Sequence, residues 1–458
     1  MNDQRQFTRR SFLQAASAVA ASAPFLLPSR IWAADANAKP NAKIVMGFIG
    51  MGTQARGLLA GFRESAEVQV VGICDVDTTR REYAVQKLQD FYTKKTGQEH
   101  KGITAYKDFR ELLQRPDLTA VCIAAPDHWH AIPVIMACER KLDIYCEKPL
   151  SLTIAEARAM ANAVRKHDRV LQTGSMQRSS SEFLKACELV RNGAIGKIKE
   201  IYISVGGPSK PCDLPEEPME PGLDWDMWLG QAPMRPYNSV LSPRRNPDPQ
   251  KVVHQHFPNW RNYREYSGGM MTDWGAHHFD IAQWGLGMDE SGPVEIIPPD
   301  GKDVKKLTFK YANGVVMYHG ALKVKDAQGK EKDSGYGVVF VGENGKVFVD
   351  RGRFKTDPEN LGAEYKAGSL PIKLYKSGNH IVDFIKCVRS RERPICDVEV
   401  GARSATVCHL GNLAYWNKRP LKWDPKAERF IGDDDANKQR DRARRAPWQG
   451  NIGDYWKA

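Results

Sequence analysis

The chain has 458 residues, of which 41% are hydrophobic and 27% are charged, values typical of a globular protein with a sizeable core. This composition excludes a disordered, fibrous or small disulfide-stapled protein, and the length favours two domains. The formal net charge is +12, but the positive residues are spread widely, so nucleic acid binding is not expected. The one basic run, residues 438–445, is interrupted by Asp441 and is predicted to be a solvated terminus rather than a polyanion site.

Residues 1–36 have the features of an export signal. Arg9 and Arg10 precede Phe12 and a mild apolar stretch that is shorter than the roughly 20 residues that a membrane span needs. Paired arginines in this context resemble the twin-arginine export signal; the alternative is an N-terminal amphipathic helix. We therefore expect the twin-arginine export machinery as a partner, a periplasmic or otherwise exported mature protein, and no stable membrane span after signal removal.

The nine cysteines are an odd number, and no two of them have C-x-x-C or zinc-finger spacing. A twin-arginine substrate folds in the reducing cytoplasm, which also argues against disulfides. We assign these thiols no chemistry.

The first part of the mature chain has the pattern of a dinucleotide-binding unit. An apolar run at 44–49 leads into a glycine-rich turn, a helical stretch from Arg56, and a second apolar run that ends in Asp75. In the turn, Gly50 permits the tight bend and Gly52 lets the backbone approach a pyrophosphate. The amides at the start of the helix, which include those of Thr53 and Gln54, are expected to face the phosphates.

Asp75 is placed to accept hydrogen bonds from the adenosine ribose. Its charge would repel a 2′-phosphate, which favours NAD as the cofactor. Arg80 and Arg81 follow closely and could serve such a phosphate, so NADP stays open.

Strands and helices continue to alternate as far as residue 173. This pattern predicts a Rossmann domain at 43–176 with a doubly wound parallel sheet. Thr153 and Glu156 form a capping box at the start of one helix. Pro126, His130 and Lys148 follow predicted strands, so they are expected on the cofactor face of the sheet. The predicted strands are 120–124, 143–146 and 170–173, and the predicted helices are 108–115, 131–140 and 153–166.

Four motifs together resemble the glucose-fructose oxidoreductase/inositol dehydrogenase/MocA (Gfo/Idh/MocA) family over residues 43–425. They are Gly50-x-Gly52 with Asp75, Ala125-Pro126-Asp127-His128-Trp129-His130, Glu147-Lys148-Pro149, and Gly268-Gly269-Met270-Met271-Thr272-Asp273-Trp274-Gly275-Ala276-His277. Three further features resemble the exported bacterial branch: the Tyr145-Cys146 form of the third motif, the Trp225-to-Tyr237 segment, and the ending of the match from 397–401 to 423–425. The resemblance implies an NAD(P)-dependent oxidoreductase, with Glu147 and His130 near the cofactor; packing would explain His130 equally well.

Residues 177–425 read as an α+β domain, followed by a tail at 426–458. A helix is predicted at 181–191 and a strand at 198–205, whereas 208–249 is irregular and is expected to wrap the surface. Asn313-Gly314 and Asn344-Gly345 predict hairpins in a largely antiparallel open sheet. In the family such a sheet stacks on another subunit, so a homo-oligomer is expected. Helices are predicted at 379–389 and 403–417.

Oxidation of a secondary alcohol requires hydride loss from carbon and proton loss from oxygen, so the site needs a base beside the nicotinamide. Lys148 is the candidate, since family members use the lysine of this motif for that purpose; a lysine in a loop is otherwise a solvated charge. The resemblance also implies a cis peptide bond between Lys148 and Pro149.

Asp273 and His277 are four residues apart, so a helix from Trp274 would place them on one face, able to share a hydrogen bond. The matching family residues contact substrate hydroxyls and relay the proton. We expect His277 to act as general acid/base and Asp273 as its orienting partner. The alternative is a capping aspartate and a packed histidine. A metal site built from neighbouring residues is not expected, because their spacing is not diagnostic; these are His254, His256, His278 and Asp280.

Five tryptophans fall within sixty residues around the proposed catalytic helix, and aromatic faces bury the apolar faces of sugars. We expect Trp260 or Trp274 to line the substrate cleft, with Gln177 and Arg178 as further substrate contacts. The other three, Trp225, Trp228 and Trp284, are expected to pack.

Three functions are compatible with these residues. The first is an exported NAD(P)-dependent oxidoreductase that acts on a ring carbon of a sugar, glycoside or polyol. The second is a glycoside-cleaving enzyme that oxidises its substrate transiently, and the third is a non-catalytic dinucleotide- or sugar-binding protein. An exported enzyme has no obvious pool of free cofactor, so we expect tightly bound NAD and a ping-pong cycle.

Overall fold

The computed structural model describes residues 43–243, 258–325, 331–450 and 452–456. The predicted signal at 1–36 lies outside the described residues, as do His254 and His256. Within the described ranges, no helix combines the length and the apolar character needed to cross a membrane.

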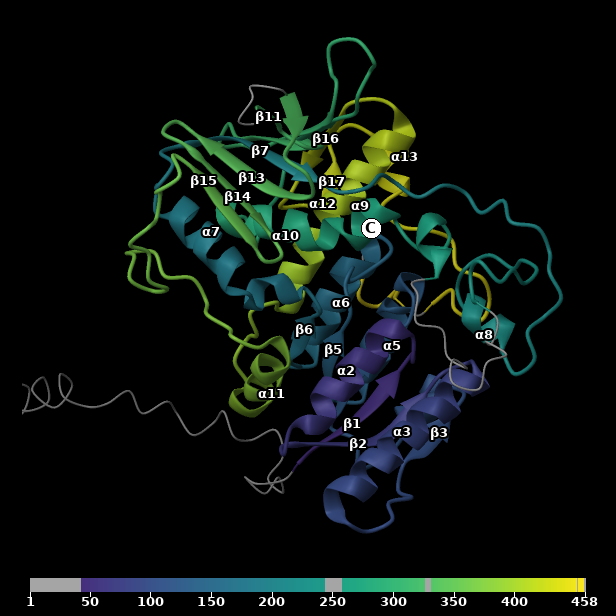
Figure 1. Ribbon diagram of the computed structural model, residues 1–458. Helices are drawn as coiled ribbons and strands as arrows, with labels where there is room; N and C mark the ends of the chain where they lie inside the picture. Colours follow the sequence, from purple (N-terminus) through teal and green to yellow (C-terminus); the bar gives the residue numbers. More distant parts are fainter. Residues whose placement is uncertain (1–42, 244–257, 326–330, 451, 457–458) are drawn as a thin grey trace, which may run out of the picture. The chain divides into compact units, whose positions relative to one another are not determined.

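The first part of the described chain forms a six-stranded parallel sheet, which confirms the predicted doubly wound architecture (Figure 1). Neighbouring strands in sequence are joined by helices, so all carboxyl ends meet at one edge of the sheet. The strand order is β3 (Thr104–Tyr106), β2 (Val68–Cys74), β1 (Ile44–Ile49), β4 (Ala120–Ile123), β5 (Asp143–Cys146) and β6 (Leu171–Thr173).

Both faces of this sheet are buried, which explains why its strands are apolar throughout. Ala120 and Cys122 of β4 belong to the core under one layer of helices, whereas Val121 and Ile123 belong to the core under the other. The first layer contains α2 (Thr53–Glu64), α3 (Thr78–Thr96) and α11 (His380–Ser390). The second contains α4 (Phe109–Leu112), α5 (Ala131–Glu139), α6 (Ile154–Lys166) and the start of α12 (Val398–Asn417).

The predicted capping box at α6 is present in part. The Thr153 hydroxyl accepts from the amide of Glu156, at 3.1 Å, as expected. The Glu156 carboxylate does not return to the cap residue; it accepts from the amide of Leu152 at 3.0 Å. Helix α4 covers Phe109–Leu112 and is therefore shorter than the predicted span, 108–115.

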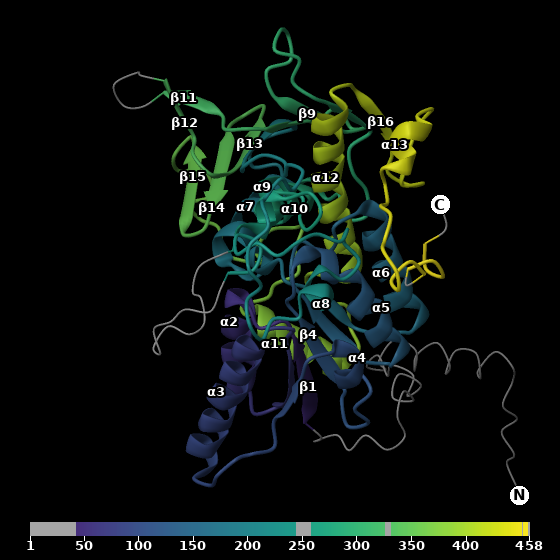
Figure 2. The same ribbon diagram turned by 90° about the vertical axis from the view of Figure 1, so that its right-hand side faces the viewer.

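The second sheet has nine strands. Within the part of this sheet that the structure describes, only the β7–β10 pair is parallel, and the other pairs are antiparallel. Helices α7 (Ser181–Arg191) and α10 (Gly275–Leu286) lie beside β13 and β14, as Figures 1 and 2 show, and the core between them includes Phe183, Phe279 and Phe340. Both predicted hairpins are confirmed. The strand order is β15 (Arg353–Asp357), β14 (Lys346–Asp350), β13 (Gly337–Gly342), β7 (Ile198–Ser204), β10 (Val316–His319), β9 (Leu307–Lys310), β8 (Glu295–Ile297), β16 (Leu421–Asp424) and β17 (Arg429–Phe430).

The long segment after β7 is not merely a surface wrap, so that expectation was wrong. It contains α8 (Trp225–Leu229) and has its own buried aromatic cluster, in which the rings of Trp225 and Trp228 stack at 4.7 Å. Tyr237, Trp260 and Tyr266 join this cluster. The aromatic content of the segment therefore supports a small separate core next to the site described below.

Candidate active site

A cavity of about 470 Å³ lies at the carboxyl ends of the parallel strands. One wall comes from the loops after β1, β2, β4 and β5, and the other from η4 (Asn259–Asn262), α9 (Met270–Asp273) and α10. Ligands of doubly wound sheets bind at this edge. The cavity therefore has the position expected for a dinucleotide and its substrate.

The glycine-rich turn has the geometry that a dinucleotide requires. Gly50 has a φ of +84°, and a β-carbon there would lie 2.7 Å from the backbone nitrogen of Ala125, so only glycine fits. Gly52 faces open space, with no atom within 4 Å of an added β-carbon. No side chain caps α2, which begins at Thr53, and Thr53 and Gln54 line the cavity, so the amide end of this helix suits a phosphate.

Asp75 connects the end of β2 to this turn. Its Oδ2 accepts from the amide of Met51 at 2.6 Å and its Oδ1 from the amide of Asp77 at 2.8 Å. Burial raises its pKa. Asp75 and Arg80 line the cavity, whereas Arg81 donates to the Asp75 carbonyl at 2.6 Å and is not in its lining.

Glu147 and His130 occupy different positions relative to the cavity. Glu147 lines it, and its Oε1 accepts from Nε2 of Gln54 at 3.0 Å. The His130 ring lies behind the lining, 2.8 Å from the carbonyl oxygen of Pro149 and 2.9 Å from that of Ala125. It therefore connects the turn after β4 to the loop that carries Lys148, and Pro126 of that turn lines the cavity.

Lys148 and Asp273 form an ion pair inside the cavity. The Lys148 Nζ donates to Oδ1 of Asp273 at 2.8 Å and to its carbonyl oxygen at 2.9 Å, and Nε of Arg261 lies 3.3 Å from the same Oδ1. Burial opposes ionisation of Asp273, but the two cations outweigh it and lower the pKa of this carboxyl. The Lys148–Pro149 peptide bond is cis, as the resemblance implied.

His277 lies in the same cavity but makes no hydrogen bond to Asp273. The expected pairing fails because the helix is interrupted: α9 ends at Asp273 and α10 begins at Gly275. Nδ1 of His277 is buried and has no partner among the described residues. Burial, together with the positive charges of Lys148 and Arg351, holds the pKa of His277 well below its usual value, so the ring is neutral.

Asp127 was not singled out from the sequence, although it stands in the motif after β4. It begins η2 (Asp127–Trp129), lines the cavity and is almost fully buried. Its Oδ2 accepts from the Ser267 hydroxyl at 2.7 Å. Burial, followed by the negative charge of Asp273, raises its pKa to about 7. An acidic residue in the turn that follows an apolar strand was the available signal.

Of the expected substrate contacts, the two tryptophans reach the cavity and the two residues after β6 do not line it. Arg261 lies over the Trp260 ring at 4.3 Å and Arg351 over the Trp274 ring at 4.6 Å. Trp228 also lines the cavity.

Gln177 and Arg178 lie in η3 (Met176–Ser179), behind the site. In the orientation in which both the nitrogen and the oxygen of the Gln177 amide have partners, the nitrogen donates to the His277 carbonyl and the oxygen accepts from Nε of Arg351. Arg178 is buried in ion pairs with Asp280 and Asp289, at 2.8 and 2.7 Å. Both residues therefore support the site from behind rather than facing it.

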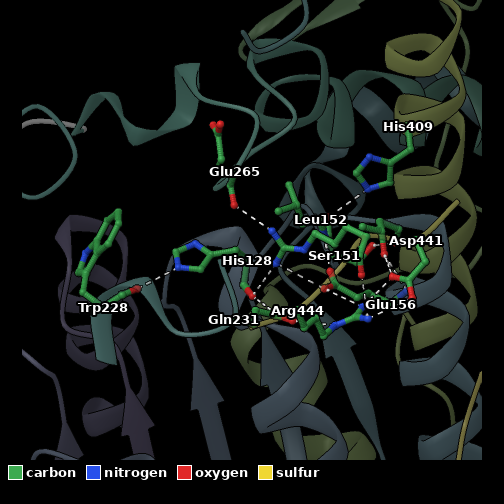
Figure 3. Close-up of polar contacts among 12 residues, drawn as sticks. His128, Ser151, Leu152, Glu156, Trp228, Gln231, Glu265, His409, Asp441 and Arg444 are labelled. Carbon is green, nitrogen blue, oxygen red and sulfur yellow. Dashed lines mark hydrogen bonds and ion pairs between the residues drawn. The ribbon is translucent and has the colours of Figure 1, made fainter. Parts of the chain in front are cut away.

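The C-terminal basic run is not a solvated terminus, and that prediction was wrong for two of its arginines. The guanidinium groups of Arg442 and Arg444 both approach Oε1 of Glu156, at 3.6 and 3.3 Å. Figure 3 shows the contact between Arg444 and Glu156. The Glu156 side chain is fully buried and Arg444 is only 5% exposed. The buried carboxylate explains the placement, because an unpaired charge at this depth is costly.

The same tail contacts the turn after β4. Arg442 donates to the carbonyl oxygen of Glu265 at 2.8 Å and lies 3.5 Å from that of His128. Arg444 donates to Oε1 of Gln231 at 2.8 Å, and Gln231 in turn donates to the His128 carbonyl (Figure 3). The tail thus joins three segments that flank the cavity.

Among the described residues, no group of three or more histidine, cysteine or acidic side chains could hold a metal ion. All nine cysteines are free thiols, and eight of them are buried.

Two family models match this chain. The family description "Oxidoreductase family, NAD-binding Rossmann fold" matches residues 44–175, and "Oxidoreductase family, C-terminal alpha/beta domain" matches residues 209–450. The chain belongs to the Gfo/Idh/MocA oxidoreductase family. The match to the second domain extends through the tail arginines.

Among curated members of this family, myo-inositol 2-dehydrogenase of Thermotoga maritima is 26% identical over 69% of this chain and 84% of that protein. An uncharacterized oxidoreductase of Bacillus subtilis, YrbE, is 29% identical over 80% of this chain and 92% of that protein.

Solved structures of the family share the fold. Aldose-aldose oxidoreductase from Caulobacter crescentus superposes with a TM-score of 0.53 at 17% identity, covering 83% of this chain and 99% of that one. Levoglucosan dehydrogenase in complex with NADH and L-sorbose gives a TM-score of 0.52 at 18% identity, with the same coverage.

Proposed function

We propose that this protein is an NAD(P)-dependent dehydrogenase that oxidises a ring carbon of a sugar, glycoside or polyol. The observation that carries the proposal is the Lys148–Asp273 ion pair beside His277, in the cavity that the glycine-rich turn also lines. The inositol and levoglucosan dehydrogenases among its relatives support the substrate class.

The chain's own residues have distinct tasks in this proposal. Gly50, Gly52 and Asp75 hold the dinucleotide, which when bound supplies the acceptor for a hydride. Lys148, fixed by Asp273, orients the substrate hydroxyl, and His277 takes part in moving its proton. Trp260 and Trp274 cover the apolar faces of the sugar ring.

The test is a panel of polyols, free sugars and glycosides incubated with the purified protein and NAD or NADP. A rise in absorbance from the reduced nicotinamide supports the dehydrogenase. Release of free sugar without net reduction would indicate the glycoside-cleaving alternative, and neither signal would indicate a binding protein. His277→Ala should lower turnover at least 100-fold while leaving cofactor affinity within severalfold, since it removes a group that we propose handles the hydroxyl proton.

Export by the twin-arginine route is part of the same proposal and is supported by Arg9 and Arg10 in the sequence. Replacing both with lysine should retain the precursor in the cytoplasm. Periplasmic activity at the wild-type level would contradict this route.

We further propose that the exported enzyme retains its NAD(H) or NADP(H) and works as a homo-oligomer. Acid extraction of protein purified without added cofactor should release close to one dinucleotide per chain; less than about a tenth of an equivalent would indicate a dissociable cofactor, since retention requires affinity well above the working concentration. Light scattering of the same sample gives the oligomeric state, and a monomer would contradict the proposed homo-oligomer.

A further inference from the structure

The cavity contains a second carboxylate that the proposed function does not use. Asp127 lies in the turn after β4, four residues beyond the end of the strand, and is 3% exposed. Its Oδ2 accepts from the Ser267 hydroxyl at 2.7 Å, and this is the hydrogen bond that the described residues make to the carboxylate. The residue lines the cavity, so its carboxylate lies beside any group bound there.

Charged groups on three other elements act on Asp127. They are Lys148 in the loop after β5, Asp273 at the end of α9, and Arg261 in η4. Burial and the Asp273 charge raise the pKa of Asp127 to about 7, although the Ser267 hydrogen bond, Arg261 and Lys148 act in the opposite direction. The nearby Cys146 thiol is neutral because burial raises its pKa. Asp127 therefore exchanges a proton near neutrality, as an efficient general base should.

The other groups in the cavity are less suited to keep a proton. Asp273 is held as a carboxylate by Lys148 and Arg261, and its pKa is lowered. The imidazolium form of His277 is opposed by burial and by the positive charges of Lys148 and Arg351. Two carboxyls whose environments drive their pKa values apart commonly have different roles in one site.

We propose that Asp127 is a further catalytic residue, whose carboxylate is where the proton lost by the substrate hydroxyl comes to rest. The inference rests on the proposed dehydrogenase function. When the substrate is oxidised, its C–H bond breaks and the hydride, with both electrons, passes to the nicotinamide. The O–H bond also breaks, its electron pair completes the carbonyl, and the proton converts the Asp127 carboxylate to a carboxylic acid. Release of that proton to water restores the site.

Asp127→Asn tests the role, because it keeps the shape and the contact with Ser267 but removes the titrating group. For the substrate found in the panel, we expect kcat to fall at least 100-fold, with KM and NAD affinity within threefold. The wild-type inflection of kcat near pH 7 should disappear. Asp213→Asn, at an exposed carboxyl outside the cavity, is the matched control and should keep the wild-type profile.

Ser267→Ala provides a second, independent variant. Removing its hydrogen bond to Oδ2 should raise the pKa of Asp127 further and move the inflection to higher pH. If Asp127→Asn does not fold, this shift decides the matter. An unmoved inflection in Ser267→Ala would overturn the assignment.

A stability measurement gives a readout that needs no turnover. A carboxyl whose pKa is raised in the folded state stabilises the fold below its unfolded pKa, near 4, and that contribution is lost as the pH rises through 7. The melting temperature of the wild type, minus that of Asp127→Asn, should therefore be lower at pH 8 than at pH 5. The same difference in melting temperature at both pH values would overturn the inference.

These outcomes separate the inference from the function on which it rests. An active wild type whose Asp127→Asn variant keeps the same activity and pH profile would overturn the role of Asp127 and leave the dehydrogenase standing. A wild type inactive on the whole panel would contradict the dehydrogenase, and with it this role for Asp127. The melting curves would then still decide whether Asp127 holds a proton near neutrality.

Discussion

Nζ of Lys148 lies 2.8 Å from Oδ1 of Asp273, although the two residues are 125 positions apart in the sequence. Lys148 follows a strand of the Rossmann sheet, whereas Asp273 ends a short helix of the second domain. The ion pair therefore forms only when the two domains are together, and neither domain alone contains the proposed proton-handling site.

Lys148→Ala should lower turnover at least 100-fold, because it removes the group that orients the substrate hydroxyl. NAD affinity, measured by calorimetry, should stay within severalfold. Lys199→Ala, whose side chain is 61% exposed in the second domain, is the control and should have wild-type kinetics. Unchanged turnover in Lys148→Ala would refute its role.

Asp75→Ala should weaken NAD binding by roughly tenfold, since hydrogen bonds to charged groups contribute about 1.5 kcal/mol or more. The substitution removes a ribose acceptor and also leaves the Met51 amide without its carboxylate. NADP should be affected less, because the lost charge repels a 2′-phosphate. Calorimetric titration with both cofactors checks this, with Asp90→Ala on α3 as the control; an unchanged preference would contradict the ribose role.

His128→Gln should change how stability depends on pH. Burial, together with Arg442, lowers the pKa of His128 to about 3, so the folded ring stays neutral while the unfolded ring takes up a proton below about 6.5. Stability from this residue is present above that pH and is lost as the pH falls. The wild type should lose about 1.4 kcal/mol more than the variant between pH 7.5 and 5.5, measured by urea unfolding. Equal losses in both proteins would mean that His128 is not held neutral.

Arg444→Met should lower the free energy of unfolding by on the order of 3 kcal/mol, because it removes one partner of a buried carboxylate. In Arg444→Met with Glu156→Gln, much of this loss should be recovered. The neighbouring Arg445 pairs with Asp226, which is 62% exposed, so Arg445→Met is a matched control with an expected loss of about 0–1 kcal/mol. Equal losses for the two single variants in urea unfolding would show that the Glu156 contact adds no stability.

The features that could be predicted from the sequence are those whose cause is local. Gly50 and the apolar runs around it specify a strand, a turn and a helix, and the structure confirms each within a few residues. The failed Asp273–His277 pairing has an equally local cause, a helix break at Trp274, but nothing in the residue spacing indicates it.

Other features depend on partners distant in sequence. The tail arginines have the spacing of a solvated run, and only the buried Glu156, 288 residues before Arg444, determines that they turn inward. Asp127 resembles any turn aspartate until the fold places Asp273 and Lys148 nearby. Periodicity and motif spacing therefore do not predict the charge interactions between residues that are distant in the sequence.

The inward-facing tail has a consequence for the order in which the protein is made. Ribosomes synthesise chains from the N-terminus, so Arg442 and Arg444 emerge after the Rossmann sheet and all strands of the second sheet. Until then, Glu156 has neither of its guanidinium partners, and Gln231 and Glu265 lack their hydrogen bonds from the tail. The Rossmann sheet can form early, but the support behind the proposed site is completed only after residue 444 has been synthesised, and a chain truncated before residue 442 would lack it.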